Sequence, residues 1–330
     1  MTTHPAVTVA GTSVHLPDEI ISNQQLAEHL DTSDDWIISH TGIRERRRLA
    51  PDLATSDMCI AAAGPALTAA GLTRADLDAI IVATYTYDQP LPSTALIVKD
   101  AIGASRALAL DITQAACASG IHAMLIAAVL LQQATMNAVL VIAADCASRV
   151  TDPGDRATRV FFGDAAAAVV LTRTRADGAG LLSYDIGSEL DYAVQIPAGG
   201  SRHPASSATV RAGQHYLQMN GRAVWDTAAD RLPSSIALAA AKAGVAVADI
   251  RHFFLHQANL NLLTHAMTRL GVPPERAPIT LDTLGNTGTA GMFTALHRIR
   301  SAGLLQPGDL YVLAGIGAGF HWGTLCFRHA

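Results

Sequence analysis

The chain repeats itself, and this repeat constrains the fold more than any other feature of the sequence. The stretch AGLTRADLDAIIVA (residues 70–83) resembles AGVAVADIRHFFLH (243–256), at an offset of 173 residues. Two more pairs follow in the same order at an offset of 171 residues, LDITQAACASGIHA (110–123) with LDTLGNTGTAGMFT (281–294) and VLVIAA (139–144) with LYVLAG (310–315). Three matches in order at a nearly constant offset predict two similar halves.

Each half alternates strand-like and helix-like segments, which is the pattern of a layered α/β fold. Short aliphatic runs at 79–84, 138–145 and 166–171 predict strands, and Ala-rich stretches at 58–70 and 120–133 predict helices. The polar stretch TRTRADGAG (172–180) separates the halves. We therefore predict two domains, residues 1–175 and 176–330. A further turn-rich stretch, 196–214, predicts a surface loop or flap.

Composition excludes several classes of protein. Half of the residues are hydrophobic and 15% are charged, as in sheets covered on both faces. A net charge of -5 indicates no nucleic-acid partner, and no apolar run is long enough to span a membrane. The N-terminus lacks a secretory signal pattern, so a cytoplasmic location is expected. The four cysteines are widely spaced without a CxxC motif, which predicts neither a metal site nor disulfides.

One of these cysteines, Cys117, lies at a repeated position among Ala, Ser and Gly. Free cysteine is among the most buried residue types, so one interpretation is a small core residue. The other interpretation is a nucleophile, because small neighbours leave room for a substrate at the sulfur. The N–H groups and dipole of a helix start also stabilise a thiolate, and the sequence predicts a helix start here.

Two further polar residues follow strand-to-helix junctions. His256 ends the apolar run HFFLH, and Asn286 lies in GNTGTAG, the counterpart of the Cys117 segment. Taken alone, His256 can be a half-buried structural histidine, and Asn286 can be an asparagine that stabilises a turn. Their joint placement with a thiol favours a single site.

Thioester chemistry fits this set of side chains. A thiolate attacks an activated acyl group and forms a covalent acyl-enzyme. Histidine and asparagine N–H groups can donate to a developing enolate oxygen. The glycine turn AGIGAGFHWG (314–323) offers backbone N–H groups for an oxyanion hole.

With these residues in place, the chain resembles the β-ketoacyl-acyl-carrier-protein synthase III family of the thiolase superfamily over essentially its whole length. The matching motifs are DTSDDWI (31–37), TGIRERR (41–47), the Cys117 segment, FFGDAAAA (161–168), HQANL (256–260), GNTGTAG (285–291) and GAGFHWG (317–323). Each motif alone is modest, but the combination is highly specific.

The resemblance implies an α/β thiolase fold with a duplicated five-layer αβαβα architecture, and a homodimer. It implies an acyltransferase that loads an acyl group from acyl-CoA onto Cys117. His256 and Asn286 would hold a malonyl thioester, on a carrier protein or on CoA, for decarboxylative condensation. The oxyanion-hole positions match the backbone N–H groups of Cys117 and Ala318. Coenzyme A thioesters are substrates in this family, and no cofactor or metal is expected.

Other family positions concern the binding of CoA. Trp36 and Arg156 match the pair that sandwiches the adenine, and Thr32 and Gly221 match further CoA contacts. A partly buried packing residue is the bland interpretation of Trp36. Leu91 stands where a phenylalanine usually reaches across the dimer to close the acyl pocket.

The departures from the family pattern bear on the substrates. His40 stands in place of an arginine that assists CoA binding, and Arg222 replaces an asparagine beside the pantetheine tunnel. Three basic positions of the carrier-protein docking face are Asp226, Asn261 and Thr268 here. Loss of those charges should slow the encounter with an acidic carrier protein.

Three alternatives to a condensing enzyme remain. An acyltransferase of specialised metabolism would pass the Cys117-bound acyl group to an alcohol or amine, with His256 as general base. A degradative thiolase usually has a second cysteine in the C-terminal glycine turn, which GIGAGF lacks. A non-catalytic binding protein would retain all three active-site residues without using them.

Overall fold

Two β-sheets form the framework of the protein. The computed structural model describes residues 6–113, 115–174, 176 and 178–330. The first sheet has the strand order β1-β7-β6-β4-β5 and the second β11-β12-β13-β8. The strands of the first sheet are β1 (Ala6–His15), β4 (Ala79–Ala83), β5 (Leu108–Ile112), β6 (Ala138–Cys146) and β7 (Asp164–Thr174), and those of the second are β8 (Gly180–Ser188), β11 (His252–Leu255), β12 (Leu310–Gly317) and β13 (His321–Arg328).

The central strands follow from continuous apolar runs. β6 reads AVLVIAADC and β4 reads AIIVA, and every residue of both strands is buried. Because helices cover both faces of these strands, the runs do not alternate with polar residues. The three strands predicted at 79–84, 138–145 and 166–171 are β4, β6 and β7.

The two sheets share one pattern of strand pairing. In the first sheet β4 pairs parallel with β6, and β7 lies antiparallel between β6 and β1. In the second sheet β11 pairs parallel with β12, and β13 lies antiparallel between β12 and β8. The likeness agrees with the sequence repeat. The domain boundary at residues 175 and 176 stays a prediction, and residue 175 lies outside the described residues.

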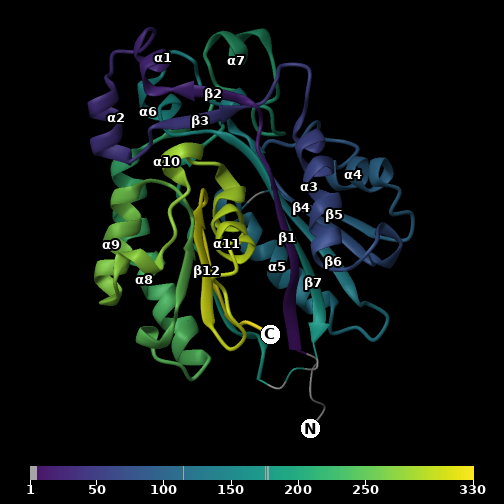
Figure 1. Ribbon diagram of the computed structural model, residues 1–330. Coiled ribbons are helices and arrows are strands. Elements are labelled where there is room, and N and C mark those ends of the chain that lie inside the picture. The colour runs from purple at the N-terminus through teal and green to yellow at the C-terminus, as the bar shows by residue number, and fades with distance from the viewer. Residues whose placement is uncertain (1–5, 114, 175, 177) are drawn as a thin grey trace.

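Helices complete five layers (Figure 1). One pair packs on the outer face of the first sheet, a second pair lies between the sheets, and a third pair covers the outer face of the second sheet. These pairs are α3 (Thr55–Ala69) with α4 (Thr94–Ile102), α5 (Ser119–Leu130) with α11 (Gly291–Ser301), and α8 (Gly221–Lys242) with α9 (Leu260–Leu270).

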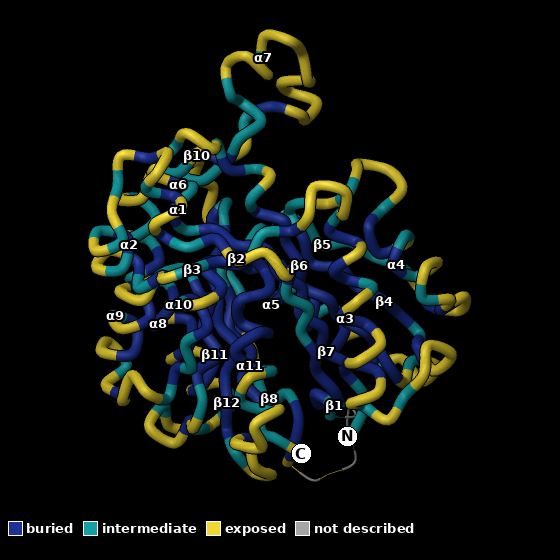
Figure 2. The backbone as a smooth tube through the Cα atoms, turned by 45° about the horizontal axis from the view of Figure 1, so that its top comes forward, coloured by how far each residue is buried: buried dark blue, intermediate teal, exposed yellow. Residues whose placement is uncertain are grey.

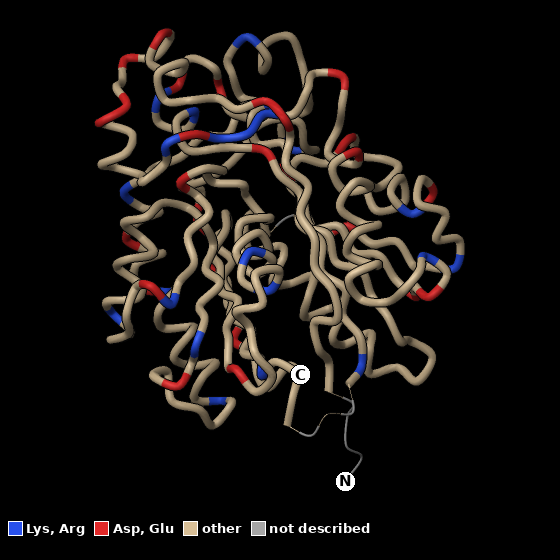
Figure 3. The backbone as a smooth tube through the Cα atoms, in the orientation of Figure 1, with Lys and Arg blue, Asp and Glu red and all other residues tan. Residues whose placement is uncertain are grey.

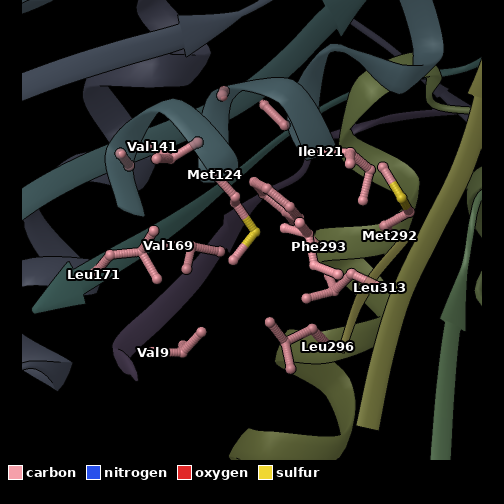
Figure 4. Close-up of a cluster of buried hydrophobic side chains, with 14 of the residues drawn as sticks. Val9, Ile121, Met124, Val141, Val169, Leu171, Met292, Phe293, Leu296 and Leu313 are labelled. Carbon is pink, nitrogen blue, oxygen red and sulfur yellow. The ribbon is translucent and has the colours of Figure 1, made fainter. Parts of the chain in front are cut away.

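The main core lies where the central helices meet both sheets. Figure 4 shows Ile121 and Met124 of α5 together with Met292 and Phe293 of α11, flanked by strand residues such as Leu313. All five are essentially inaccessible to solvent. Burial of side chains of this size contributes about 1.5–3 kcal/mol each. This core fixes the N-terminal ends of the two central helices relative to each other.

Short elements cover one end of the two sheets. They are two small ribbons, β2 (Glu19–Ser22) with β3 (Glu45–Arg48) and β9 (Val194–Gln195) with β10 (Gln218–Met219), and the helices α1 (Asn23–Ala27), α2 (Asp34–Thr41), α6 (Arg156–Arg159), α7 (Ser207–Arg211) and α10 (Leu281–Leu284). The predicted flap at 196–214 is largely exposed and projects from the body, as Figure 2 shows, but it contains the helix α7. A Ser206 cap that accepts from the backbone N–H of Thr209 explains that helix.

Lys, Arg, Asp and Glu residues lie mostly on the outer segments of the chain (Figure 3). Among the described residues, the buried ones that carry Lys, Arg, Asp or Glu side chains are Arg46, Asp145, Asp164 and Asp185. Within the same part of the chain, no helix has the length and apolar character needed to cross a membrane.

Candidate active site

Cys117 lies in a tight turn at the start of the central helix α5. The turn is a single 3-10 turn, Ala116–Ala118, that leads directly into α5. Ala116 has a φ of 43°, a left-handed conformation that a residue with a side chain adopts at a cost. Gly317 packs against this turn, since a Cβ there would meet the Ala115 carbonyl and lie 2.8 Å from the Cys117 nitrogen. The turn therefore depends on a glycine from the opposite half.

The resting state of Cys117 differs from the expectation of a stabilised thiolate. Burial raises the pKa of the thiol well above its usual value, and the nearby carboxylate of Asp145 raises it further. These two effects outweigh the hydrogen bond from the backbone N–H of Cys117, which lowers the pKa of the thiol. The sulfur is a neutral thiol until it reacts.

His256 follows β11 and sits at the inner end of the site. Its backbone N–H donates to the Ala314 carbonyl at 2.8 Å, which continues the pairing of β11 with β12. Burial lowers the pKa of the imidazole to about 4, so the ring is neutral at pH 7. Nδ1 is buried and has no hydrogen-bond partner among the described residues. A buried N–H without an acceptor is costly, which favours the tautomer with the proton on Nε2.

Asn286 is held by backbone contacts between two glycine-containing segments. Its N–H donates to the Phe161 carbonyl at 2.7 Å, and its carbonyl accepts from Gly163 at 3.1 Å. Gly163 permits this approach, because a Cβ there would meet the Leu284 carbonyl. The side-chain Oδ1 accepts from the Gly288 N–H at 3.0 Å. The amide NH2 group therefore points away from Gly288 and has no hydrogen-bond partner among the residues that the structure describes, so it can donate to a ligand.

The three predicted residues converge on one cavity. Cys117, His256 and Asn286 all line a narrow space of about 130 Å³ between the two halves. Gly221, at the start of α8, and Ala318 line it as well. Aromatic and aliphatic side chains form most of its remaining wall, including Phe161, Phe162, Met219, Trp225, Leu262 and Phe320. The site thus combines one nucleophile and a few polar groups in an apolar passage.

The predicted oxyanion hole lies beside the sulfur. The backbone N–H groups of Cys117 and Ala318 donate to no backbone carbonyl among the described residues. Both residues line the same cavity, and Gly317 brings the two segments into contact. Two backbone N–H groups next to a nucleophile are suited to a developing oxyanion.

A second and wider cavity opens on the other side of Cys117. Its volume is about 470 Å³, and Cys117, Phe162, Val194 and Ala318 line both this cavity and the narrow one. A group bound to the sulfur can therefore extend into this space while a second thioester occupies the narrow passage.

The proposed entrance for CoA lies around Trp36 on α2. The ring of His40 stacks on that of Trp36 with centroids 4.2 Å apart. The Arg156 guanidinium lies 4.8 Å from the Trp36 ring centroid and donates to the Asp31 carbonyl. An adenine between Trp36 and Arg156 needs about 7 Å, two contacts of about 3.5 Å. The predicted sandwich is therefore closed, and the exposed Arg156 side chain has to move before it can hold a base.

Known proteins resemble this chain over nearly its whole length. Models of 3-oxoacyl-[acyl-carrier-protein] synthase III match residues 110–190, and models of the C-terminal part of that family match 240–329. The β-ketoacyl-[acyl-carrier-protein] synthase III of Symbiobacterium thermophilum is 40% identical over 324 residues, which are 98% of each chain. The chain belongs to the synthase III family.

Solved structures agree with this assignment. The 3-oxoacyl-(acyl carrier protein) synthase III of Pseudomonas aeruginosa PAO1 is 35% identical, covers 98% of each chain and has a TM-score of 0.89. The priming β-ketosynthase of the R1128 polyketide pathway is 28% identical, with a TM-score of 0.91 and coverage of 100% of this chain and 98% of its own. The predicted thiolase fold, the condensing-enzyme class and the acyltransferase class are confirmed. The relatives' names favour a condensing enzyme over the acyltransferase alternative.

The remaining predicted residues of this synthase III-family chain lie outside the catalytic cavity. Leu91 is 84% exposed and lines neither cavity of its own chain. Thr32 is half-buried, and its hydroxyl has no partner among the described residues. Arg222 is exposed and pairs with Asp226 at 2.9 Å.

Sequence reasoning missed two residues that organise the site. Asp145, the last residue but one of β6, receives hydrogen bonds from both halves, and Tyr85 lines the wide cavity. A carboxylate at the end of the run AVLVIAAD was a signal for Asp145, because a buried charge needs several partners. Nothing in the sequence distinguished Tyr85 from other loop residues.

Proposed function

We propose that the protein condenses an acyl group from acyl-CoA with a malonyl thioester to give a β-ketoacyl thioester. The observation that supports this most is the convergence of Cys117, His256 and Asn286 on one cavity. This set contains a nucleophile for the acyl group and two N–H donors for an enolate. The family membership and the names of the relatives point the same way.

In the first step, the Cys117 sulfur attacks the carbonyl carbon of the acyl-CoA. The new S–C bond forms, the bond from that carbon to the CoA sulfur breaks, and the thiol proton passes to the departing CoA. The backbone N–H groups of Cys117 and Ala318 receive the transient oxyanion. Since burial keeps the pKa of Cys117 high, the proton leaves the sulfur only as the attack proceeds.

In the second step, a malonyl thioester occupies the narrow cavity. Its carboxylate leaves as CO2, and the electron pair of the broken C–C bond forms an enolate. Neutral His256, through Nε2–H, and the Asn286 amide donate to the enolate oxygen. The enolate carbon then attacks the acyl-Cys117 carbonyl, the S–C bond breaks, and the sulfur regains a proton from solvent.

We also propose that CoA enters past Trp36, Arg156, Thr32 and Gly221. Gly221 lines the narrow cavity, and a Cβ there would meet nothing within 4 Å, so a larger side chain would point into open space along the passage. Gly221→Leu should therefore raise the KM for acyl-CoA, and Trp36→Ala should do so by loss of stacking. Equal KM values for both variants and the native enzyme would exclude this route.

The identity of the malonyl carrier depends on the outer faces of α8 and α9. Asp226, Asn261 and Thr268 are exposed on these two adjacent helices. Arg222 contributes a positive charge there, but Asp226 pairs with it. Arg269 of α9 is exposed as well, but Asp226, Asn261 and Thr268 themselves carry no positive charge. The loss of basic side chains at these three positions favours malonyl-CoA over an acidic carrier protein as the donor.

A homodimer is part of the proposal. β5 is an edge strand of the first sheet, and an unpaired edge invites pairing with another strand. Large apolar side chains near the wide cavity are exposed, among them Tyr192 at 68% and Leu190 at 77%. A second copy would cover them and would bring Leu91 towards the partner's cavity. Sedimentation of the purified chain tests this, and a monomer at micromolar concentration would contradict it.

The decisive experiment is intact-protein mass spectrometry. Incubation with an acyl-CoA should add the mass of the acyl group, and Cys117→Ala should abolish the gain. Later addition of malonyl-CoA or malonyl-carrier protein should discharge the acyl group with release of CO2 and a β-keto product. His256→Ala and Asn286→Ala should still accept the acyl group but discharge it at least about 100-fold more slowly.

Two outcomes would contradict the proposal. Acylation that neither malonyl donor discharges, but that an amine or alcohol does, would indicate the acyltransferase alternative. Acylation that persists in Cys117→Ala would show that another group is the nucleophile. Cys326→Ala is the matched control, because Cys326 is buried in β13 and lines neither cavity.

A further inference from the structure

The wide cavity beside Cys117 has an unusual lining. Tyr85, Tyr87, Tyr192 and Phe162 all contribute to it. Aromatic residues make up only 5% of the chain, and it has six tyrosines in total. Half of the tyrosines therefore line one cavity. This concentration of aromatic residues indicates which kind of ligand the cavity accepts.

The rings of these four residues form no stacked or edge-to-face pair, although Tyr85 and Phe162 belong to one apolar cluster. No aromatic pair and no cation–π contact involves any of them among the described residues. Elsewhere in the fold, Tyr311 contacts both Phe254 and Phe327 in ring pairs. Aromatic rings gain energy from stacked or edge contacts with other rings. The rings around the cavity are thus available for such a contact with a ligand.

Tyr85 forms a rigid part of the wall. Its backbone N–H donates to the Asp145 carboxylate at 3.0 Å. Its ring edge lies against Gly288, where a Cβ would be 2.9 Å from Cε1. The hydroxyl is buried and has no partner among the described residues. The ring is therefore fixed between the Asn286 loop and the space beside Cys117.

The charge of the lining excludes one class of acyl group. No Lys, Arg or His is among the described residues that line the wide cavity, and Asp191 stands at its exposed rim. An acyl group that ends in a carboxylate would have no cation to pair with and would be repelled by Asp191. The acyl group that fits is uncharged.

The volume of the wide cavity argues against a second class of acyl group, the very short ones. The cavity has a volume of about 470 Å³, room for many water molecules. A two-carbon acyl group would leave most of this space to solvent and would touch none of the outer rings. The proposed second copy would close the exposed rim at Tyr87 and Tyr192, which confines the ligand further.

We propose that Cys117 takes an uncharged aromatic acyl group, an aryl or arylalkanoyl unit, whose ring packs against Tyr85 and its aromatic neighbours. This inference rests on the proposed function, because it names the class of acyl-CoA that loads Cys117. Tyr85 is the specificity-determining residue, since it is the fixed ring nearest the Asn286 loop.

The test compares rates of Cys117 acylation by phenylacetyl-, octanoyl-, acetyl- and succinyl-CoA, followed by intact-protein mass spectrometry. Phenylacetyl-CoA should react at least about tenfold faster than each of the others, as expected for two or more ring contacts. A higher rate with octanoyl- or acetyl-CoA would overturn the aromatic assignment but leave the acyl-enzyme intact. Failure of all four would overturn the proposed function itself.

Two variants distinguish the effect of the aromatic ring of Tyr85 from the effect of its size. Tyr85→Leu should lower the ratio of the phenylacetyl to the octanoyl rate about fivefold, because one ring contact is lost. Tyr85→Phe keeps the ring and should keep the ratio within about twofold. Tyr184→Leu is the matched control, since Tyr184 is exposed on β8 and lines neither cavity. An unchanged ratio in Tyr85→Leu would overturn the role of Tyr85.

Discussion

Asp145 in the first half holds Thr289 in the second half. One carboxylate oxygen accepts from both the backbone N–H and the hydroxyl of Thr289, each at 2.8 Å. The other oxygen accepts from the Tyr85 N–H and the Thr84 hydroxyl, both at 3.0 Å. Thr289 lies three residues after Asn286. A single buried carboxylate therefore couples the wall of the wide cavity to the loop that carries Asn286.

The first prediction concerns the protonation of Asp145. Burial raises the pKa of this carboxyl from 3.8 to about 6. The folded protein thus binds a proton more tightly than the unfolded chain does, and the stability from Asp145 is lost as the pH rises through about 6. The free energy of unfolding of the native protein minus that of Asp145→Asn should fall by about 2 kcal/mol between pH 4 and pH 7.

Urea unfolding of both proteins at a series of pH values measures this difference. Parallel curves for the native protein and the variant would contradict the prediction. Asp145→Asn should also slow condensation, because an amide NH2 would face the donors of Thr289 and displace the Asn286 loop.

The second prediction concerns Gly317, which packs against the Cys117 turn. A Cβ there would lie 2.7 Å from the Ala118 nitrogen, 2.8 Å from the Cys117 nitrogen and against the Ala115 carbonyl. Gly317→Ala should therefore displace the sulfur and slow its acylation at least about 100-fold. Mass spectrometry measures the rate, and circular dichroism checks the fold. Gly154→Ala is the control, because Gly154 lies in an exposed turn with only an ordinary contact at 3.6 Å.

The sequence predicted much of this arrangement, for physical reasons. The repeat predicted two like halves, and strand-to-helix junctions at like positions predicted that Cys117, His256 and Asn286 would converge. The raised pKa of the thiol could not be predicted, because desolvation and the charge of Asp145 depend on tertiary packing. The closed contact of Arg156 with Trp36 and the tyrosine-lined cavity also arise from segments far apart in the chain, which local patterns do not report.

The third prediction concerns Gln257, which ties the His256 segment to the segment before α10. Its carbonyl oxygen accepts from Thr280 at 2.9 Å and Leu281 at 3.3 Å, and its amide donates to the Leu255 carbonyl at 2.9 Å. Gln257→Met retains the shape but loses these bonds. We expect the kcat of condensation to fall about 100-fold through misplacement of His256 and Asn286.

Acylation of Cys117 separates this positioning role from a general loss of structure. Cys117 lies on another segment, so its acylation rate in Gln257→Met should change less than about threefold. A parallel loss of acylation and condensation would instead indicate that the variant disturbs the whole fold. Gln306→Met is the control, because Gln306 is exposed in a surface turn.

The fourth prediction concerns His256, whose effect on the free energy of unfolding changes with pH in the opposite direction to that of Asp145. Burial lowers the pKa of His256 from 6.5 to about 4. Between these pH values the imidazole is protonated in the unfolded chain but mostly neutral in the folded protein. Stability is therefore lost as the pH falls from about 6.5 towards 4. The free energy of unfolding of the native protein minus that of His256→Asn should fall by about 3 kcal/mol between pH 7 and pH 4.

In the native protein, the slopes from His256 and Asp145 act in opposite directions over nearly the same range of pH, so only the single variants expose either one. The same low pKa means that His256 stays neutral and keeps its N–H donor well below pH 7. The rate of decarboxylation of the malonyl thioester should consequently not fall between pH 7 and pH 5.5 because of His256. Any fall in that range should be present in His256→Asn as well. An acidic limb near pH 6.5 that vanishes in His256→Asn would mean that the imidazole is protonated there and that its pKa is not lowered.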